Sequence, residues 1–566
     1  MRRMIVLWAL LVPCPLAGMY MAPSAAAQEA PAEATPERIA ELIQQLGDDD
    51  FFVRERAQTE LQGIGFEAFD ALTAAETDDD IEISARAKYL LRKIRVEWVA
   101  ESDSPQVKEI LKDYERANTT DRLQRMQRLA QLPDDAGLPA LCRLLRFEQS
   151  PINAKQAALR VMELPNTETT DWARREKIIT ETLARTQRSP AEWLKVYLAA
   201  HHDLAAAYAD WAALCSAEEQ TLSQYPDQTQ AEVVLALLRQ QIEWLDQLNR
   251  GDESLDVLKR MLALAAGDAD ALRAVAVQFY KLAEKREQSG DEDAAQNIAD
   301  QARAISPGNT IEHLRVAIQL RGMGLLKWAE QEYRHVISLG PPGREFTLLA
   351  QWSLAEMLHD QDKELAAAEV LQPAAAAMQE NVRQGNAQNN RGREPGESRA
   401  RMHYFFANHF AAQGDRDKQI EHLEAGLKDN PLDADVLIAM YRLPEQTPEW
   451  KERTKKAIEK AAAAFRQEIE NDPDNPENAI PYNQLAWLIG NTEGDYDEAV
   501  RSALKALELR PETPEYMDTL GRCYFTKGDL ENAIKHQSKA VELDPHSGQM
   551  QRQLELFLAA QAEKQK

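Results

Sequence analysis

The stretch that decides the fold begins at Tyr482 and reads YNQLAWLIGNTEGDYDEAVRSALKALELRP as far as Pro511, then EYMDTLGRCYFTKGDLENAIKHQSKAVELDP from Glu515 to Pro545. Apolar residues in both halves recur three and four positions apart, which is the spacing of one face of an α-helix. A Gly-Asp pair breaks this pattern in the middle of each half, and a proline ends it. Because Pro511 and Pro545 lie 34 residues apart, the stretch predicts two successive helical hairpins.

The same signature recurs toward the N-terminus. A large apolar residue precedes a small one on the expected first helix of each hairpin, at Leu282-Ala283, Val316-Ala317, Leu354-Ala355, Phe406-Ala407, Leu485-Ala486 and Leu520-Gly521. Small residues at a crossing let two helix backbones approach closely. Two helices cannot bury their apolar faces alone, so the pattern predicts an all-α solenoid of stacked hairpins.

These motifs resemble the tetratricopeptide repeat, a helical hairpin with a period of about 34 residues. The resemblance implies a right-handed α-solenoid with repeats over 271–378, one repeat plus an irregular helical pair over 400–473, and two strong repeats over 476–545. Residues 546–566 are expected to form a capping helix. Residues 379–399 are rich in Asn, Gln, Gly and Arg, and they predict a low-complexity loop within the array.

A second period, of 30 residues, lies near the N-terminus, where Asp50, Val53, Arg56, Ala57 and Leu61 recur as Asp80, Ile83, Arg86, Ala87 and Leu91. This unit resembles the HEAT repeat, and we expect HEAT-like repeats over 37–165. The aspartates before each helix are expected to cap it rather than to bind calcium, since the spaced D-x-D-x-D-G loop is absent from the sequence. We expect degenerate helical repeats over 166–270, and the sequence does not decide to which repeat class they belong.

The first 27 residues have the pattern of a secretory signal peptide. Arg2 and Arg3 precede an apolar stretch, and three alanines stand before Gln28. We expect cleavage between Ala27 and Gln28, followed by a flexible segment over 28–36, with an uncleaved anchor as the alternative. The mature chain is then exported to a periplasm-like or extracellular compartment and does not insert into the membrane.

The composition limits the partners of the chain. It has 66 Lys and Arg against 93 Asp and Glu, which gives a formal net charge of −27. Binding to nucleic acid or to anionic lipid depends on a cationic surface, so both partners are excluded. Four cysteines in 566 residues are too few for a disulfide framework, and Cys142, Cys215 and Cys523 are expected to be buried thiols.

No motif in the sequence predicts catalysis, a metal site or a cofactor. Glu332-x-x-His335 and Glu356-x-x-His359 each match one arm of a di-metal carboxylate site, which needs two such arms and two further glutamates. The first pair is expected on an outer second helix and the other on a first helix, so the two pairs should not converge. A hydrolase that uses Glu356 and His359 remains an alternative from a different functional class.

The tetratricopeptide resemblance implies a concave groove that is lined by the first helices and takes peptides, protein tails or partner helices. The residues that its register places there are Arg315, Ile318, Arg321, Trp352, Glu356, His359, Arg401, Tyr404, Phe405, Asn408, Asn483, Trp487, Asp518, Arg522 and Phe525. The alternative for several of them is packing against the neighbouring repeat. The set with which some family members hold a carboxylate tail is incomplete, because Asn408 fits but no lysine does.

The sequence as a whole predicts an exported, non-enzymatic scaffold that binds a protein or peptide partner in the groove of this solenoid. An accessory or chaperone subunit of a cell-envelope assembly complex is the alternative with the same fold. No cofactor is expected.

Overall fold

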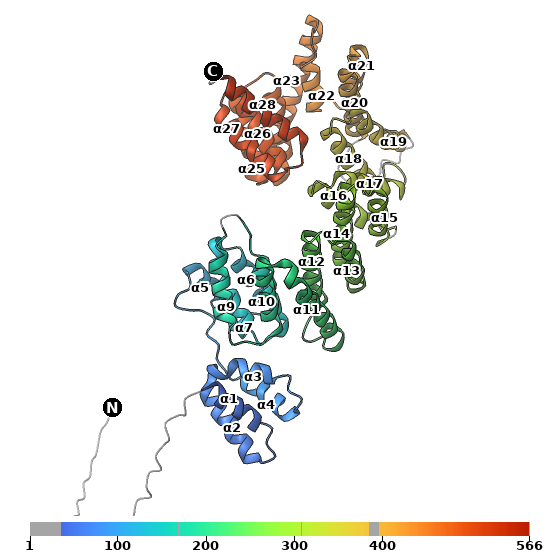
Figure 1. Ribbon diagram of the computed structural model, residues 1–566. Coiled ribbons are helices and arrows are strands. Elements are labelled where there is room, and N and C mark those ends of the chain that lie inside the picture. Colours follow the sequence, from blue (N-terminus) through green and yellow to red (C-terminus); the bar gives the residue numbers. More distant parts are fainter. Residues whose placement is uncertain (1–34, 168–169, 307, 384–394, 565–566) are drawn as a thin grey trace, which may run out of the picture. The chain divides into compact units, whose positions relative to one another are not determined.

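The computed structural model describes residues 35–167, 170–306, 308–383 and 395–564, and every regular element in them is a helix (Figure 1). The expected all-α fold is therefore confirmed. The chain divides into two units, one of residues up to Val234 and one from Leu235 onward. The expected signal peptide, with Ala27 and Gln28, lies outside the described residues.

The first unit is built of helices of 7 to 21 residues. Its helices are α1 (Pro36–Gln45), α2 (Phe51–Ile64), α3 (Phe69–Ala75), α4 (Ile81–Leu91), α5 (Pro105–Leu111), α6 (Thr119–Ala130), α7 (Leu138–Phe147), α8 (Pro151–Met162), α9 (Trp172–Leu183), α10 (Ser189–His202) and α11 (Leu204–Gln224). Single 3-10 turns occur at Gly65–Ala68, Tyr114–Arg116 and Pro133–Asp135.

The two copies of the 30-residue repeat have equivalent capping residues and equivalent core residues. Asp50 accepts a hydrogen bond from the backbone N–H of Phe52 at 2.8 Å, and Asp80 accepts one from Glu82 at 2.8 Å. The expectation that these aspartates cap helices is thus confirmed. The apolar positions of both copies share one core, which includes Ala57, Leu61, Ile83, Ala87 and Leu91. The HEAT-like assignment of 37–165 stays a prediction.

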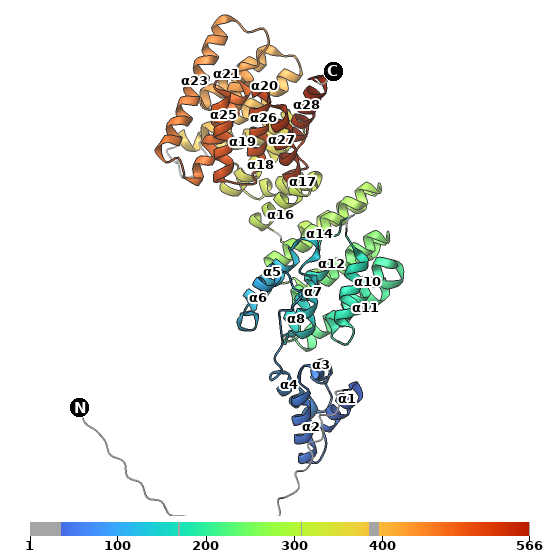
Figure 2. The same cartoon turned by 90° about the vertical axis from the view of Figure 1, so that its left-hand side faces the viewer.

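The second unit is a stack of helical hairpins, seen from a second side in Figure 2. Helix α12 (Ala231–Gln247) crosses the boundary between the units. The hairpins that follow are built from α13 (Gly251–Leu264), α14 (Ala269–Gln288), α15 (Glu292–Arg303), α16 (Thr310–Gly322), α17 (Leu326–Ser338), α18 (Glu345–Asp360), α19 (Glu364–Arg383), α20 (Pro395–Ala412), α21 (Arg416–Asp429), α22 (Ala434–Tyr441), α23 (Pro448–Asn471), α24 (Ala479–Asn491), α25 (Tyr496–Leu509), α26 (Pro514–Lys527), α27 (Leu530–Leu543) and α28 (Gly548–Lys564). A 3-10 turn at Pro476–Asn478 precedes α24.

Small residues sit where the helices of a hairpin cross. Ala283, Ala317, Ala355 and Ala486 are fully buried on their first helices. Gly521 takes the same place on α26, where an added Cβ would lie 2.7 Å from the side-chain oxygen of Gln537. The close approach therefore explains why the sequence alternates large and small apolar residues on these helices.

Two features of the array depart from regular hairpins. Helix α19 continues to Arg383 and α20 begins at Pro395, so the helices occupy both ends of the stretch 379–399 that the sequence predicts as a loop. The alanine run before that stretch favours a helix and buries Ala374 and Ala375, and a proline is well suited to the first position of a helix. The short α22 and the long α23 form the irregular pair.

No helix in the described residues is long and apolar enough to cross a membrane.

The cap of α4 is open to a direct test. Replacing Asp80 by Ala should weaken α4 by about 1 kcal/mol, because the N–H groups of Glu82 and Ile83 lose their acceptor. We expect about fivefold faster hydrogen exchange of the α4 amides. Asp79→Ala, at an exposed neighbour, is the control. Equal exchange in both variants would show that Asp80 does not stabilise the helix.

Candidate functional site on the first helices of the second unit

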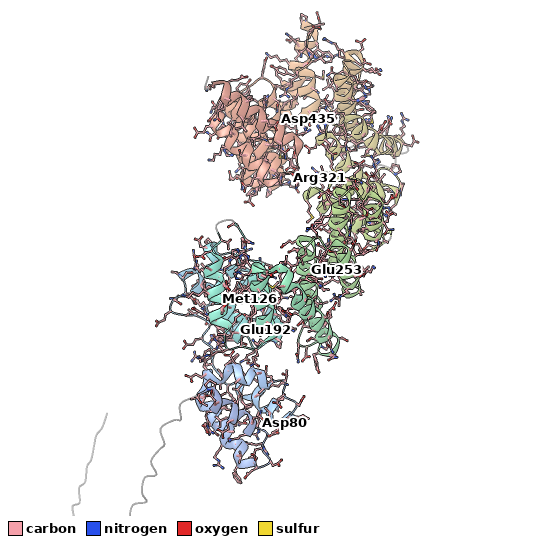
Figure 3. The ribbon with its side chains drawn as sticks, viewed as in Figure 1. Asp80, Met126, Glu192, Glu253, Arg321 and Asp435 are labelled. Carbon is pink, nitrogen blue, oxygen red and sulfur yellow. The ribbon has the colours of Figure 1, made fainter. Side chains whose placement is uncertain are left out.

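The guanidinium of Arg401 links the first helices of three consecutive hairpins. From α20 it donates two hydrogen bonds of 2.7 Å to Glu356 on α18 and one of 2.5 Å to Asp435 on α22. The indole of Trp487 on α24 donates to the other oxygen of Asp435 at 2.8 Å. We call Glu356, Arg401, Asp435 and Trp487 the first-helix seam, and Asp435 is labelled in Figure 3.

The ion pairs of the seam keep Arg401 and Asp435 charged despite their burial. Burial disfavours the charged form of Arg401, but Glu356 and Asp435 outweigh it and raise the pKa of Arg401. Burial likewise opposes ionisation of Asp435, yet Arg401 and Trp487 lower its pKa below the ordinary value. Asp433, the cap of α22, is different, because burial and the nearby Asp435 raise its pKa to about 6. One carboxylate of this pair is thus held charged, and the other is pushed toward its neutral form.

Three of the residues expected in the groove are buried in the packing between hairpins. Trp352 donates to the hydroxyl of Ser398 at 3.1 Å, and Phe405 is fully buried under the guanidinium of Arg401. His359 is 8% exposed and lies 2.7 Å from Glu364. The prediction that these side chains face a partner is therefore wrong, because the neighbouring hairpin covers them.

Two guanidiniums on the same helices have no carboxylate partner among the residues that the structure describes. Arg522 on α26 has a buried Nε atom without a hydrogen-bond acceptor. Its pKa is lowered first by burial and then by the positive charge of Arg442. Arg442, which follows α22, is exposed and donates only to the amide oxygen of Asn491. The family register did not point to Arg442, because that register does not extend through the irregular pair α22–α23.

The other predicted residues differ in their exposure and in their partners. Tyr404 and Trp487 are half-buried, and Ile318 is 50% exposed. Asn483 has a buried side-chain oxygen with no partner in the described part of the chain. The remaining members are engaged by other residues of the chain: Arg315 with Glu312, Arg321 with Tyr333, Asn408 with Glu364, Asp518 with Gln537 and Gln553, and Phe525 with Phe557.

Two family models describe this part of the chain. Both are models of the tetratricopeptide repeat, and they match residues 481–513 and 514–547. The matches coincide with the hairpins α24–α25 and α26–α27. Residues 481–547 of the chain are therefore tetratricopeptide repeats.

Solved structures are also similar to it, among them two of tetratricopeptide-repeat proteins and one of yeast Tom70. A thermophilic protein of Thermus thermophilus has 20% identity, with 37% of this chain and 97% of that one covered at a TM-score of 0.25. A protein of Parabacteroides merdae has 13% identity over 50% of this chain and 98% of that one, at a TM-score of 0.28. Tom70 of yeast has 12% identity over 94% and 97%, at a TM-score of 0.28. No curated protein matches the chain.

The two Glu-x-x-His pairs of the chain belong to separate clusters. Glu332 accepts from Tyr280 and lies 2.7 Å from the Nδ1 atom of His313. Glu356 is instead occupied by Arg401. Within the described ranges, no group of three or more His, Cys, Asp or Glu side chains could hold a metal ion.

The cysteines are buried, as the sequence predicts. Cys142, Cys215 and Cys523 lie buried in the interior. Burial raises the pKa of the Cys142 and Cys523 thiols to about 12, so both are protonated near neutral pH. These two thiols are not activated nucleophiles.

Asp518 provides a pH-dependent test of this face. Burial raises its pKa from 3.8 to about 6 despite hydrogen bonds from Gln537 and Gln553. Because the folded-state pKa is raised, ionisation of Asp518 costs stability as the pH rises from 3.8 to about 6, and the full cost is present above that interval. Asp518→Asn should therefore stabilise α26–α28 by on the order of 1 kcal/mol near pH 8.

The gain should disappear below about pH 4, where the carboxyl is neutral in both the folded and the unfolded chain. Hydrogen exchange of α26–α28 at both pH values measures it. Asp417→Asn, at an exposed residue of α21, should leave the hydrogen exchange of α26–α28 unchanged at both pH 8 and pH 4. A stabilisation that is equal at both pH values would contradict the assigned cause.

Proposed function

We propose that this chain is a non-enzymatic scaffold that holds a polypeptide partner against the first helices α20, α22, α24 and α26. The observation that carries the proposal is the unmatched positive charge of Arg522 and Arg442. The chain has a net charge of −27, so acidic groups to pair with them are abundant. A half-buried guanidinium without an acceptor is costly, and a carboxylate from a partner would remove that cost.

The surroundings of the two guanidiniums suit a peptide. Tyr404 and Trp487 are half-buried and offer aromatic surface, which contributes contact area at little cost in conformational entropy. Together these groups fit a polypeptide segment that carries an acidic side chain next to an apolar one.

Hydrolysis by Glu356 and His359 has less support. Glu356 is neutralised by two hydrogen bonds from Arg401, and His359 is buried against Glu364. A general acid or base must reach the reacting group, and neither side chain is placed to do so.

We also propose that the scaffold works outside the cytoplasm. The support is the charged, apolar and small-residue pattern of residues 1–27. The partner is then a protein of the cell envelope or of the surrounding medium.

Capture of partners from envelope extracts tests the proposal. The mature wild-type chain should retain a reproducible set of proteins, and Arg442→Ala combined with Arg522→Ala should weaken their retention about tenfold or more, because charge-assisted hydrogen bonds are lost. Titration of the captured protein with each variant measures the change.

Arg334→Ala combined with Arg501→Ala is the matched control, because both arginines are exposed on second helices. This control should retain partners as the wild type does. Retention that is unchanged by loss of Arg442 and Arg522 would show that the first-helix guanidiniums do not bind the partner.

A further inference from the structure

The first backbone N–H groups of α28 donate to a carboxylate of α18, a helix far earlier in the sequence. Asp360 ends α18, and its side chain accepts from the backbone N–H groups of Gly548 and Gln549, both at 2.9 Å. It also accepts from the hydroxyl of Ser547 at 3.0 Å. Asp360 and Gly548 are 188 residues apart. The carboxylate therefore acts at the start of α28 as a capping side chain would, but from another hairpin.

A second set of contacts surrounds this cap. Arg552 of α28 pairs with the carboxylate of Asp362 at 3.1 Å and donates to the backbone carbonyl of Asp360 at 3.2 Å. The loop before α28 also packs against the turn that joins α16 to α17. There an added Cβ on Gly324 would lie 2.5 Å from the ring of His546.

The contact joins two ends of one continuous stack. From α18 to α28, each helix packs on the next one along the chain. First helices of successive hairpins also pack on one another, as α20 does on α22, α22 on α24 and α24 on α26, whereas the second helices do not pack as closely. The row of first helices is therefore the inner side of the curve, and the stack returns to its own beginning at Asp360.

We propose that Asp360, Asp362 and Arg552 form a clasp that closes α18–α28 into a ring around the first-helix seam. A folded domain then cannot reach the inner side while the clasp is shut, whereas an extended polypeptide segment can. The identity of the occupant rests on the proposed function, but the closure does not.

The chemistry of the clasp suits a contact that opens. Arg552 is 44% exposed and Asp362 is 71% exposed, so solvent and salt screen their attraction. The carboxylate of Asp360 faces the positive end of the α28 dipole. Reversing this one charge removes the cap and adds repulsion from both the helix end and Arg552.

Access to the inner side can be measured without any partner. Asn408→Cys places a thiol on the inner row at α20, and Lys428→Cys places one on the exposed side of α21. The native cysteines of the described part are buried and serve as an unreactive background. Each full-length variant, in which Cys14 is also replaced by Ser, is labelled with N-ethylmaleimide and with a maleimide that carries a large polyethylene glycol chain.

The ratio of the two labelling rates reports closure. We expect the large reagent to be slowed far more at position 408 than at position 428. Asp360→Arg should raise the relative rate of the large reagent at 408 several-fold and leave 428 unchanged. Arg552→Glu should have the same effect, and circular dichroism verifies that each variant keeps its helices.

The clasp would be overturned if, in the wild type, the ratio of the two labelling rates at position 408 equalled the ratio at position 428. It would also be overturned if neither substitution changed the ratio at position 408. Because no partner is present, this result is independent of the capture experiment. The clasp can fail while Arg442 and Arg522 still bind a partner, and the reverse outcome is equally distinguishable.

Discussion

The second unit depends on a single guanidinium that is shared by three hairpins. Arg401 forms ion pairs with both Glu356 and Asp435, and Asp435 also accepts a hydrogen bond from the indole N–H of Trp487. Without Arg401, the carboxylates of Glu356 and Asp435 would be partly desolvated and would lose their ion pairs, and such a loss is strongly destabilising. The ion pairs therefore hold α18, α20 and α22 in one register. That register determines where the free side chains of the same face lie.

The face that results has two electrostatic parts. The groups of the seam are paired with one another, whereas Arg442 and Arg522 at its edge have no carboxylate partner in the described part of the chain. Specificity in such a surface comes from the unmatched part, because only those groups gain a partner on binding. The matched part supplies the fixed positions from which they act.

The sequence predicts the local features of this structure well and its long-range contacts poorly. The helices α24–α27 and the small residues at their crossings follow from periodicity and turn residues, which act over a few positions. The burial of Trp352 and His359 depends on a neighbouring hairpin, so a register that places them on the inner face cannot reveal it. The contact of Asp360 with Gly548 spans 188 residues and has no local signal at all.

The central claim is that the partner lies on the inner row of helices, and photo-crosslinking tests it most directly. A photoreactive amino acid at Tyr404 should crosslink to the captured partner, and the same group at Glu424, on the exposed side of α21, should not. The peptide found at Tyr404 should contain an acidic residue. Crosslinks that form at Glu424 and are absent at Tyr404 would contradict the account.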